Sequence, residues 1–192
     1  MMKIKMILFT VLLGFFGEGN AQETPENILL KIKLPSSVLV KGTSTLHDWE
    51  SNVEKTDTQI TVNNLSDVNI ETLYVTIDAL SIKSGKNIMD KLTYKALKAE
   101  EHPEIKFIFK KGKIVDQNKT FIDIELNGDL TIAGVAKNVT VLTKINKNGE
   151  TIVLKGSHKL KMTDFGITPP KALLGTIKTG DEITIEFNLI FQ

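Results

Sequence analysis

Apolar and polar residues alternate along most of this chain, and this alternation constrains the fold more than any other feature of the sequence. Successive side chains of a β-strand point to opposite faces, so a period of two indicates a strand with one buried face. The pattern is clearest over residues 28–34, 139–145 and 183–191. The same reasoning predicts further strands near residues 38–49, 53–62, 68–80, 105–115, 120–132 and 151–162. We therefore expect an all-β protein of antiparallel strands.

Turn residues separate several of these segments. Asn148-Gly149 lies between two alternating runs, and Asn-Gly suits the positive φ angles of a tight hairpin turn. Residues 116–119 predict a second, longer turn. Asn127-Gly128 lies inside a strand-like segment, where it favours a bulge or a barrel bend over a chain reversal.

Residues 87–101 follow a helical period instead. Their apolar residues recur at helical spacing, Asn87 suits the capping position, and Pro103 follows the segment. We interpret Asp90 first as a helix-start residue, because a carboxylate there interacts favourably with the positive end of the helix dipole. The expected architecture is one antiparallel barrel or sandwich with one helix on or over it. A closed barrel of about eight strands has an interior that side chains fill or that holds one slender ligand.

The N-terminal residues predict export. Two lysines precede an apolar run over residues 6–16, and Gly19 and Ala21 supply small residues after it. This pattern is typical of a secretory signal peptide over residues 1–21. Residues 22–192 are then expected to form a single domain in the periplasm or outside the cell. The apolar run is too short to cross a bilayer, so no transmembrane segment is expected.

Composition excludes several functions. Without residues 1–21 the chain has 22 basic and 22 acidic residues, and every basic residue is lysine. The planar fork of arginine, which reads guanine edges and grips phosphates, is missing, so nucleic-acid binding is not expected. The chain has no cysteine, which excludes disulfides, thiolate nucleophiles and thiolate metal sites.

Residues 41–50 read Lys-Gly-Thr-Ser-Thr-Leu-His-Asp-Trp-Glu, which includes the only tryptophan and the residue types of a serine hydrolase. On one β-strand, Ser44 and Asp48 would face one side of the sheet, and His47 and Trp49 the other. Ser44 could not then reach His47, so a catalytic triad is not expected. We interpret the run as a barrel wall anchored by Trp49 and expect no enzyme activity.

The three histidines, His47, His102 and His158, do not pair at the spacings that place metal ligands side by side on a strand or helix. Each is interpreted as a hydrogen-bonded or exposed imidazole. No metal site and no cofactor are expected.

Four motifs together resemble the YceI-like family of polyisoprenoid-binding proteins. They are GTSTLHDWE, MDKLTYKALKAEEHPEIKF, GDLTIAGVAKNVTV and DFGI, and their order and spacing carry the resemblance over residues 28–191. The resemblance implies an extended antiparallel lipocalin-like β-barrel of about eight strands with one short α-helix. It also implies a carrier that threads an isoprenoid or another long-chain amphiphile through the barrel.

The resemblance assigns candidate ligand-binding residues, position by position, to the pocket rim or lining. Trp49 also suits a core position at the barrel base, and Asp48 also suits a turn. More typical members carry an arginine where this chain has Met89, and an aromatic pair within residues 95–98. Without arginine, the bidentate grip on a pyrophosphate is absent. The candidates are His47, Asp48, Trp49, Asp90 and Phe165.

Two functions remain open on this basis. One is an exported, non-enzymatic protein that holds a polyisoprenoid, a quinone or another long-chain amphiphile in the barrel interior. The other is a ligand-free structural or stress-related interaction module with a barrel packed solid. A continuous apolar tunnel favours the first and a filled interior the second. The sequence leaves the lipid and the oligomeric state open, with a dimer among the options.

Overall fold

The computed structural model describes residues 27–65 and 68–192, so the signal peptide expected over residues 1–21 lies outside the described part. Long antiparallel strands form a closed ring in the order β1-β3-β4-β6-β7-β8-β9-β11, because β11 pairs back to β1. The expected all-β barrel of eight strands with one short α-helix is therefore confirmed. The strands of the ring are β1 Ile28–Ser44, β3 Thr56–Val62, β4 Ile70–Asp78, β6 Glu104–Gln117, β7 Phe121–Ile132, β8 Val135–Asn148, β9 Thr151–Lys161 and β11 Ile177–Phe191.

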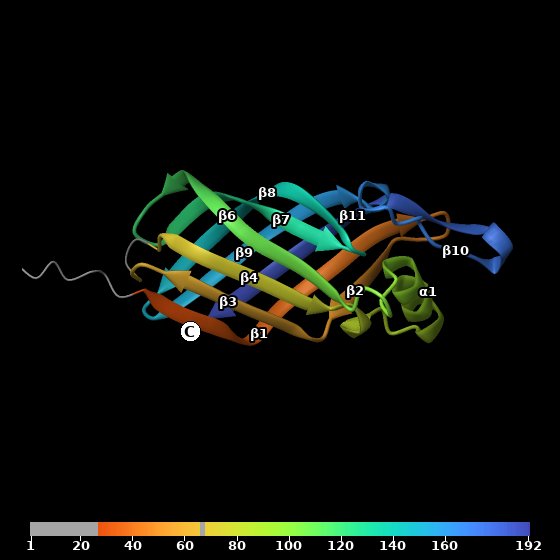
Figure 1. Cartoon of the computed structure of the whole chain (residues 1–192), viewed down its shortest axis with the longest axis horizontal. Coiled ribbons are helices and arrows are strands. Elements are labelled where there is room, and N and C mark those ends of the chain that lie inside the picture. Colours follow the sequence, from red (N-terminus) through yellow and green to blue (C-terminus); the bar gives the residue numbers. More distant parts are fainter. Residues whose placement is uncertain (1–26, 66–67) are drawn as a thin grey trace, which may run out of the picture.

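Shorter elements extend the ring. Strand β2 (Trp49–Val53) pairs with β1, β5 (Ile82–Lys83) with β2, and β10 (Lys171–Ala172) with β11. Figure 1 shows β2, β10 and helix α1 (Asn87–Leu97) toward one end of the elongated barrel, and the C-terminus near the other. Among the described residues, no helix is long and apolar enough to cross a membrane. The described residues also include three short 3-10 helices: η1 Ala79–Ser81, η2 Met162–Phe165 and η3 Leu173–Gly175.

Strand β7 shows why the alternation predicts the barrel. From Phe121 to Ile132 every second residue is buried and every other one is half-buried, so one face of the strand lies in the core. The buried set consists of Ile122, Ile124, Leu126, Gly128, Leu130 and Ile132. Aliphatic side chains on a pleated surface stabilise this arrangement by removing apolar area from water.

The interpretation of residues 41–50 as one strand is wrong. Strand β1 ends at Ser44, and β2 returns antiparallel to it with Gly42 opposite Trp49. The Ser44 Oγ accepts hydrogen bonds from the backbone amides of Leu46 and His47, both at 3.2 Å. This side chain replaces the ladder partners that a continuing strand would need, so the chain turns here. The run is a hairpin, and residues 45–48 form its turn.

Asn127-Gly128 marks a bulge, but the extra residue lies on the neighbouring strand. On β6, Phe109 pairs with Gly128 and Lys111 pairs with Asn127. Lys110, between them, therefore has no partner in the β6–β7 ladder. A Cβ on Gly128 would lie 2.5 Å from the Ile108 carbonyl oxygen, so only glycine allows β6 to approach this closely. The hairpins predicted at residues 116–119 and 148–149 both form, joining β6 to β7 and β8 to β9.

Helix α1 begins at Asn87 as expected and ends at Leu97, before the predicted end at residue 101. Lys86 occupies the N-cap position, so the capping role expected for Asn87 is wrong. The helix ends because Lys98 adopts left-handed backbone angles, with φ at 51°. Apolar residues at helical spacing give the helix one face suited to packing on the barrel.

Apolar side chains fill the barrel unevenly. At the end that holds the C-terminus, a large cluster that includes Ile60, Ile122, Ile145 and Phe191 is almost completely buried. A smaller cluster lies toward the α1 end and contains Leu160, Met162 and Phe165 from β9 and η2. The first cluster closes one end of the barrel.

Candidate functional site

A cavity of about 230 Å³ lies beneath α1. Helix α1 contributes Met89, Leu92 and Ala96 to its wall, and the facing barrel strands contribute residues such as Val40 and Ile183. The apolar face of the helix therefore closes over the cavity, while Ala96 and Leu97 also pack against the smaller apolar cluster. Concave sites of this apolar kind bind small molecules mainly by removing apolar surface from water.

A second cavity of about 110 Å³ lies deeper in the barrel. The two cavities share four wall residues, one from each of four strands: Val38, Ile77, Ile105 and Ile185. Because the same side chains border both, the cavities are neighbours within one barrel interior. Together they form a narrow apolar space that a long, slender molecule could occupy.

Two segments from opposite parts of the chain form the rim of the first cavity. The turn over residues 45–48 contributes Leu46 and His47, and β10 contributes Lys171. Thr45 connects the segments: its amide donates to the Lys178 carbonyl oxygen at 3.0 Å, and its Oγ1 accepts from the Lys178 amide at 3.1 Å. The hairpin turn and the start of β11 are thus held together as one rim.

Trp49 lines the cavity from the start of β2. Its ring packs on Gly42, where an added Cβ would lie 2.3 Å from the indole. The indole Nε1 donates to the Thr43 carbonyl oxygen at 3.0 Å, which satisfies the only polar atom of the side chain. The ring is therefore fixed in orientation, with part of its surface available to the cavity.

His47 also lines the cavity, and its polar neighbours bond to the main chain. The Ser44 hydroxyl donates to the His47 carbonyl oxygen at 2.7 Å, and the His47 Nδ1 lies 2.6 Å from the Asp48 carbonyl oxygen. These bonds shape the turn and do not form the serine-to-imidazole-to-carboxylate relay of a hydrolase. Asp48 is exposed and lies outside the cavity wall, between two residues that belong to it.

Asp90 lies behind the cavity wall and positions the helix. Its side chain is 8% exposed and its Oδ1 accepts from the Ser84 amide at 2.8 Å and the Ser84 hydroxyl at 2.6 Å. Burial opposes ionisation, but the two bonds from Ser84 and the charge of Lys83 outweigh it and hold the pKa of Asp90 below its ordinary value. Asp90 thus fixes the loop before α1, and its neighbour Met89 reaches the cavity.

Phe165 lies in the core next to the cavity. It is 2% exposed within the cluster at the α1 end, and its neighbours Met162 and Ile167 line the cavity. Asp181 holds this turn by accepting from the Thr163 amide and hydroxyl, and both bonds lower the pKa of the Asp181 carboxyl. Of the five sequence candidates, the structure therefore brings His47 and Trp49 to the cavity wall and places the other three beside it.

His158 is a cavity residue, and its interpretation as a hydrogen-bonded or exposed imidazole is wrong. It lies on β9 and lines the deeper cavity, where its surroundings are almost entirely aliphatic and aromatic. Burial lowers the pKa of the His158 imidazole, which favours the neutral ring. Within residues 27–65 and 68–192, no group hydrogen-bonds this ring. The signal was its position, four residues after Leu154 and two before Leu160, on the inward side of the alternation.

The described residues contain no group of three or more histidine, aspartate or glutamate side chains that could hold a metal ion. The polar groups of the cavity wall, such as His47 and Lys171, therefore do not form such a group. They can hydrogen-bond a ligand oxygen or orient a head group.

Comparisons with known proteins agree with this fold. A family model described as YceI-like domain matches residues 34–191. BcnA of Burkholderia cenocepacia superposes with a TM-score of 0.69 at 22% identity, covering 81% of this chain and 95% of that one. A domain from Saccharophagus degradans, described as polyisoprenoid binding and implicated in plant cell wall breakdown, gives 0.65 at 8% identity, covering 87% and 99%.

The YceI protein of Campylobacter jejuni gives a TM-score of 0.60 at 22% identity, covering 73% of this chain and 82% of that one. A search of curated proteins gives no match. At these identities the solved structures establish the fold, while the family model covers most of the sequence. The chain belongs to the YceI-like family.

Proposed function

We propose that this protein binds a polyisoprenoid, a quinone or another long-chain amphiphile, with the chain in the barrel interior. The observation that carries this proposal is the pair of apolar cavities that share Val38, Ile77, Ile105 and Ile185 as common wall. Each methylene that enters such a space contributes about 0.8 kcal/mol of binding free energy. The description of the Saccharophagus domain as polyisoprenoid binding supports the same ligand class.

The head group would lie at the rim, where the polar groups are. His47 and Lys171 border the opening and can hydrogen-bond a hydroxyl, a carbonyl or a single phosphate. Lysine binds a phosphate as a point charge, without the two parallel bonds that arginine makes. This favours a head group smaller and less charged than a pyrophosphate.

We further propose that the protein binds its ligand without catalysing a reaction and that it acts outside the cytoplasm. The main-chain bonds of Ser44 and His47 support a binding role over hydrolysis. The pattern of residues 1–21 supports export to the periplasm or the medium. The alternative of a ligand-free structural module requires a solid interior, whereas two apolar cavities lie inside this barrel.

Native mass spectrometry of detergent-free protein tests this function, together with organic extraction of whatever co-purifies. We expect a bound mass that extraction removes. Ala96→Phe places a ring in the cavity under α1 and should reduce the bound fraction about tenfold, because the ring occupies volume that the ligand would otherwise fill. Lys95→Phe adds the same ring on the exposed side of the helix and serves as the control.

Uptake of geranylgeraniol by the extracted protein provides the second measurement. Binding should change the fluorescence of Trp49, the only tryptophan, because its ring lines the cavity. Recovery of apo mass alone from several preparations, with no uptake of the alcohol, would contradict the proposed function.

A further inference from the structure

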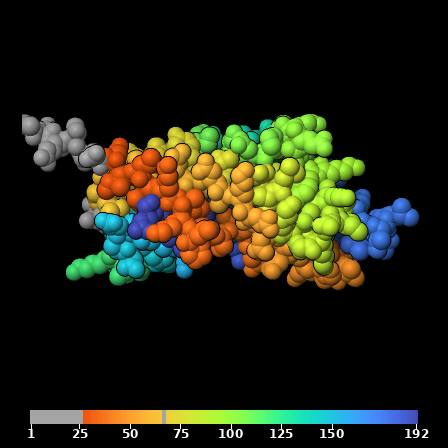
Figure 2. All heavy atoms as spheres, turned by 90° about the horizontal axis from the view of Figure 1, so that it is seen from below, coloured from red at the N-terminus to blue at the C-terminus, as the bar shows by residue number. Residues whose placement is uncertain are grey.

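An apolar tip projects from the rim of the cavity. Strands β10 and β11 pair through only two rungs, Lys171 with Lys178 and Ala172 with Ile177, and η3 connects them. Leu173 is 71% exposed and Leu174 is fully exposed. Figure 2 shows the blue atoms of this region projecting beyond the yellow-green atoms of α1 at the end of the molecule. Two adjacent leucines are thus presented to solvent.

The backbone of the tip is unfavourable for leucine. Leu173 and Leu174 have φ angles of 48° and 53°, in the left-handed region that residues with a Cβ rarely adopt. Burial usually compensates such a conformation, and here neither leucine is buried in the protein. Exposed apolar side chains on a strained loop indicate a binding surface that is uncovered in the free protein.

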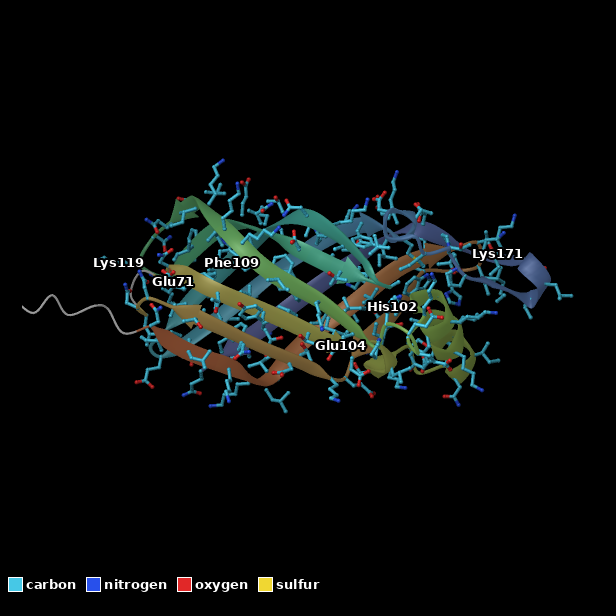
Figure 3. The ribbon with its side chains drawn as sticks, viewed as in Figure 1. Glu71, His102, Glu104, Phe109, Lys119 and Lys171 are labelled. Atoms are coloured by element: carbon cyan, nitrogen blue, oxygen red, sulfur yellow. The ribbon has the colours of Figure 1, made fainter. Side chains whose placement is uncertain are left out.

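Positive charge lies at the base of the same tip. Lys171 and Lys178 stand directly opposite each other across the β10–β11 pair, where like charges destabilise a sheet. Within the described part of the chain, neither lysine forms an ion pair with a carboxylate. Figure 3 shows Lys171 next to the projecting tip. An anionic surface would relieve this repulsion and cover the leucines at the same time.

The tip is continuous with the cavity opening. Lys171, Ala172 and Ile177 line the cavity, and the hydrogen bonds of Thr45 hold the tip beside Leu46, which is itself 66% exposed. A flat partner with apolar and anionic groups that contacted the tip would also face the opening of the cavity. Leucines flanked by lysines are the combination with which proteins enter the boundary between head groups and acyl chains.

We propose that residues 171–178 form a membrane-docking tip, with Leu173 and Leu174 inserted among the acyl chains of an anionic bilayer and Lys171 and Lys178 on the head groups. Docking brings the cavity opening to the lipid surface, where a long-chain ligand could enter or leave. The inference goes beyond the proposed function, because docking needs no ligand in the barrel. Vesicle binding and ligand binding are therefore measured separately.

Sedimentation with vesicles of phosphatidylcholine, with and without phosphatidylglycerol, tests the docking. We expect binding to the anionic vesicles that weakens as salt is added, because exposed charges are screened. Replacing both tip leucines by serine (Leu173→Ser, Leu174→Ser) should reduce binding at least tenfold, and Lys171→Gln with Lys178→Gln should remove most of the salt dependence. Matched controls are Leu34→Ser with Leu142→Ser and Lys119→Gln with Lys155→Gln, which remove exposed side chains elsewhere.

A fluorescent label locates the contact. Because the chain has no cysteine, Thr176→Cys provides a single labelling site in the tip, and Lys119→Cys provides one near the opposite end of the molecule. Anionic vesicles should shift the emission of the tip label to the blue and leave the other label unchanged. No binding to anionic vesicles, equal loss in tip and control variants, or equal shifts of both labels would overturn the proposal.

Discussion

Gly42 and Trp49 determine each other's place at the rim. A side chain at residue 42 would collide with the indole, which packs directly on the Gly42 backbone across the β1–β2 pair. The ring is held from the other side by its bond to the Thr43 carbonyl. Trp49 therefore both packs against the β1–β2 hairpin and lines the cavity. The two interpretations of Trp49 that the sequence leaves open, a core residue and a ligand-binding residue, are compatible.

His158 should make the stability of the protein depend on pH. Burial lowers the pKa of its imidazole below 6.5, so the unfolded chain binds more protons than the folded protein just below that pH. The free energy of unfolding should then decrease as the pH falls below about 6.5. His158→Leu should reduce this decrease, measured by urea unfolding at about pH 7.5 and about pH 5.

The exposed His47 provides the control for this measurement, as His47→Gln removes a histidine from the turn over residues 45–48 and not from the barrel interior. The same slope in His158→Leu as in the unmodified chain would show that the His158 ring is not desolvated as the structure indicates.

Strands and helix differ in how far local sequence determines them. β7 could be predicted because each inward position carries an aliphatic residue or glycine, so its period of two is unbroken. The turn over residues 45–48 was predicted as part of a strand, because Asp48 alone suits a turn and the segment has no glycine or proline, and the bonds that form the turn come from the Ser44 side chain. The sequence of α1 likewise predicted a helix, but not that its apolar face would line a cavity.

Asp90 should control how firmly α1 closes over the cavity. Asp90→Ala removes the buried carboxylate that accepts from the Ser84 amide and hydroxyl and should cost about 1–3 kcal/mol in the free energy of unfolding. Asp90→Asn keeps an acceptor oxygen and should restore part of this loss. Hydrogen exchange should show faster opening of residues 87–97 in the alanine variant.

Asp48→Ala is the matched control for the helix, because this carboxylate is exposed on the turn beside the cavity. It should leave both the stability and the exchange of residues 87–97 unchanged. If Asp90→Ala also left them unchanged, the bonds to Ser84 would not be what positions the helix.

At the scale of the whole molecule, the binding space results from contacts between distant parts of the chain. Val38 and Ile185 share the wall between the two cavities although 146 residues separate them, and this proximity arises when β11 closes the ring on β1. No local pattern contains that information, so the alternation predicted the barrel but not where its interior stays open. Family resemblance placed His47 and Trp49 near the opening. The alternation along β9 placed His158 on the inward face but did not show that a cavity lies there.

The shared wall should set the longest chain that the barrel accepts. Val38 borders both the outer and the deeper cavity. Val38→Phe should therefore block the passage between the two cavities and leave the outer cavity able to bind a ligand. The affinity for isoprenoid alcohols of increasing length can be measured by the change in Trp49 fluorescence. The Val38→Phe variant should bind the shortest alcohol with the affinity of the unmodified protein. Each further isoprene unit should raise the affinity of the unmodified protein but not that of the variant. Leu39→Phe introduces the same ring at the next residue of β1, outside both cavities, and should bind the whole series normally. Thermal unfolding of both variants separates overpacking, which costs about 1–3 kcal/mol, from a specific block. Equal loss for short and long alcohols in a folded Val38→Phe variant would mean that the two cavities do not act in series.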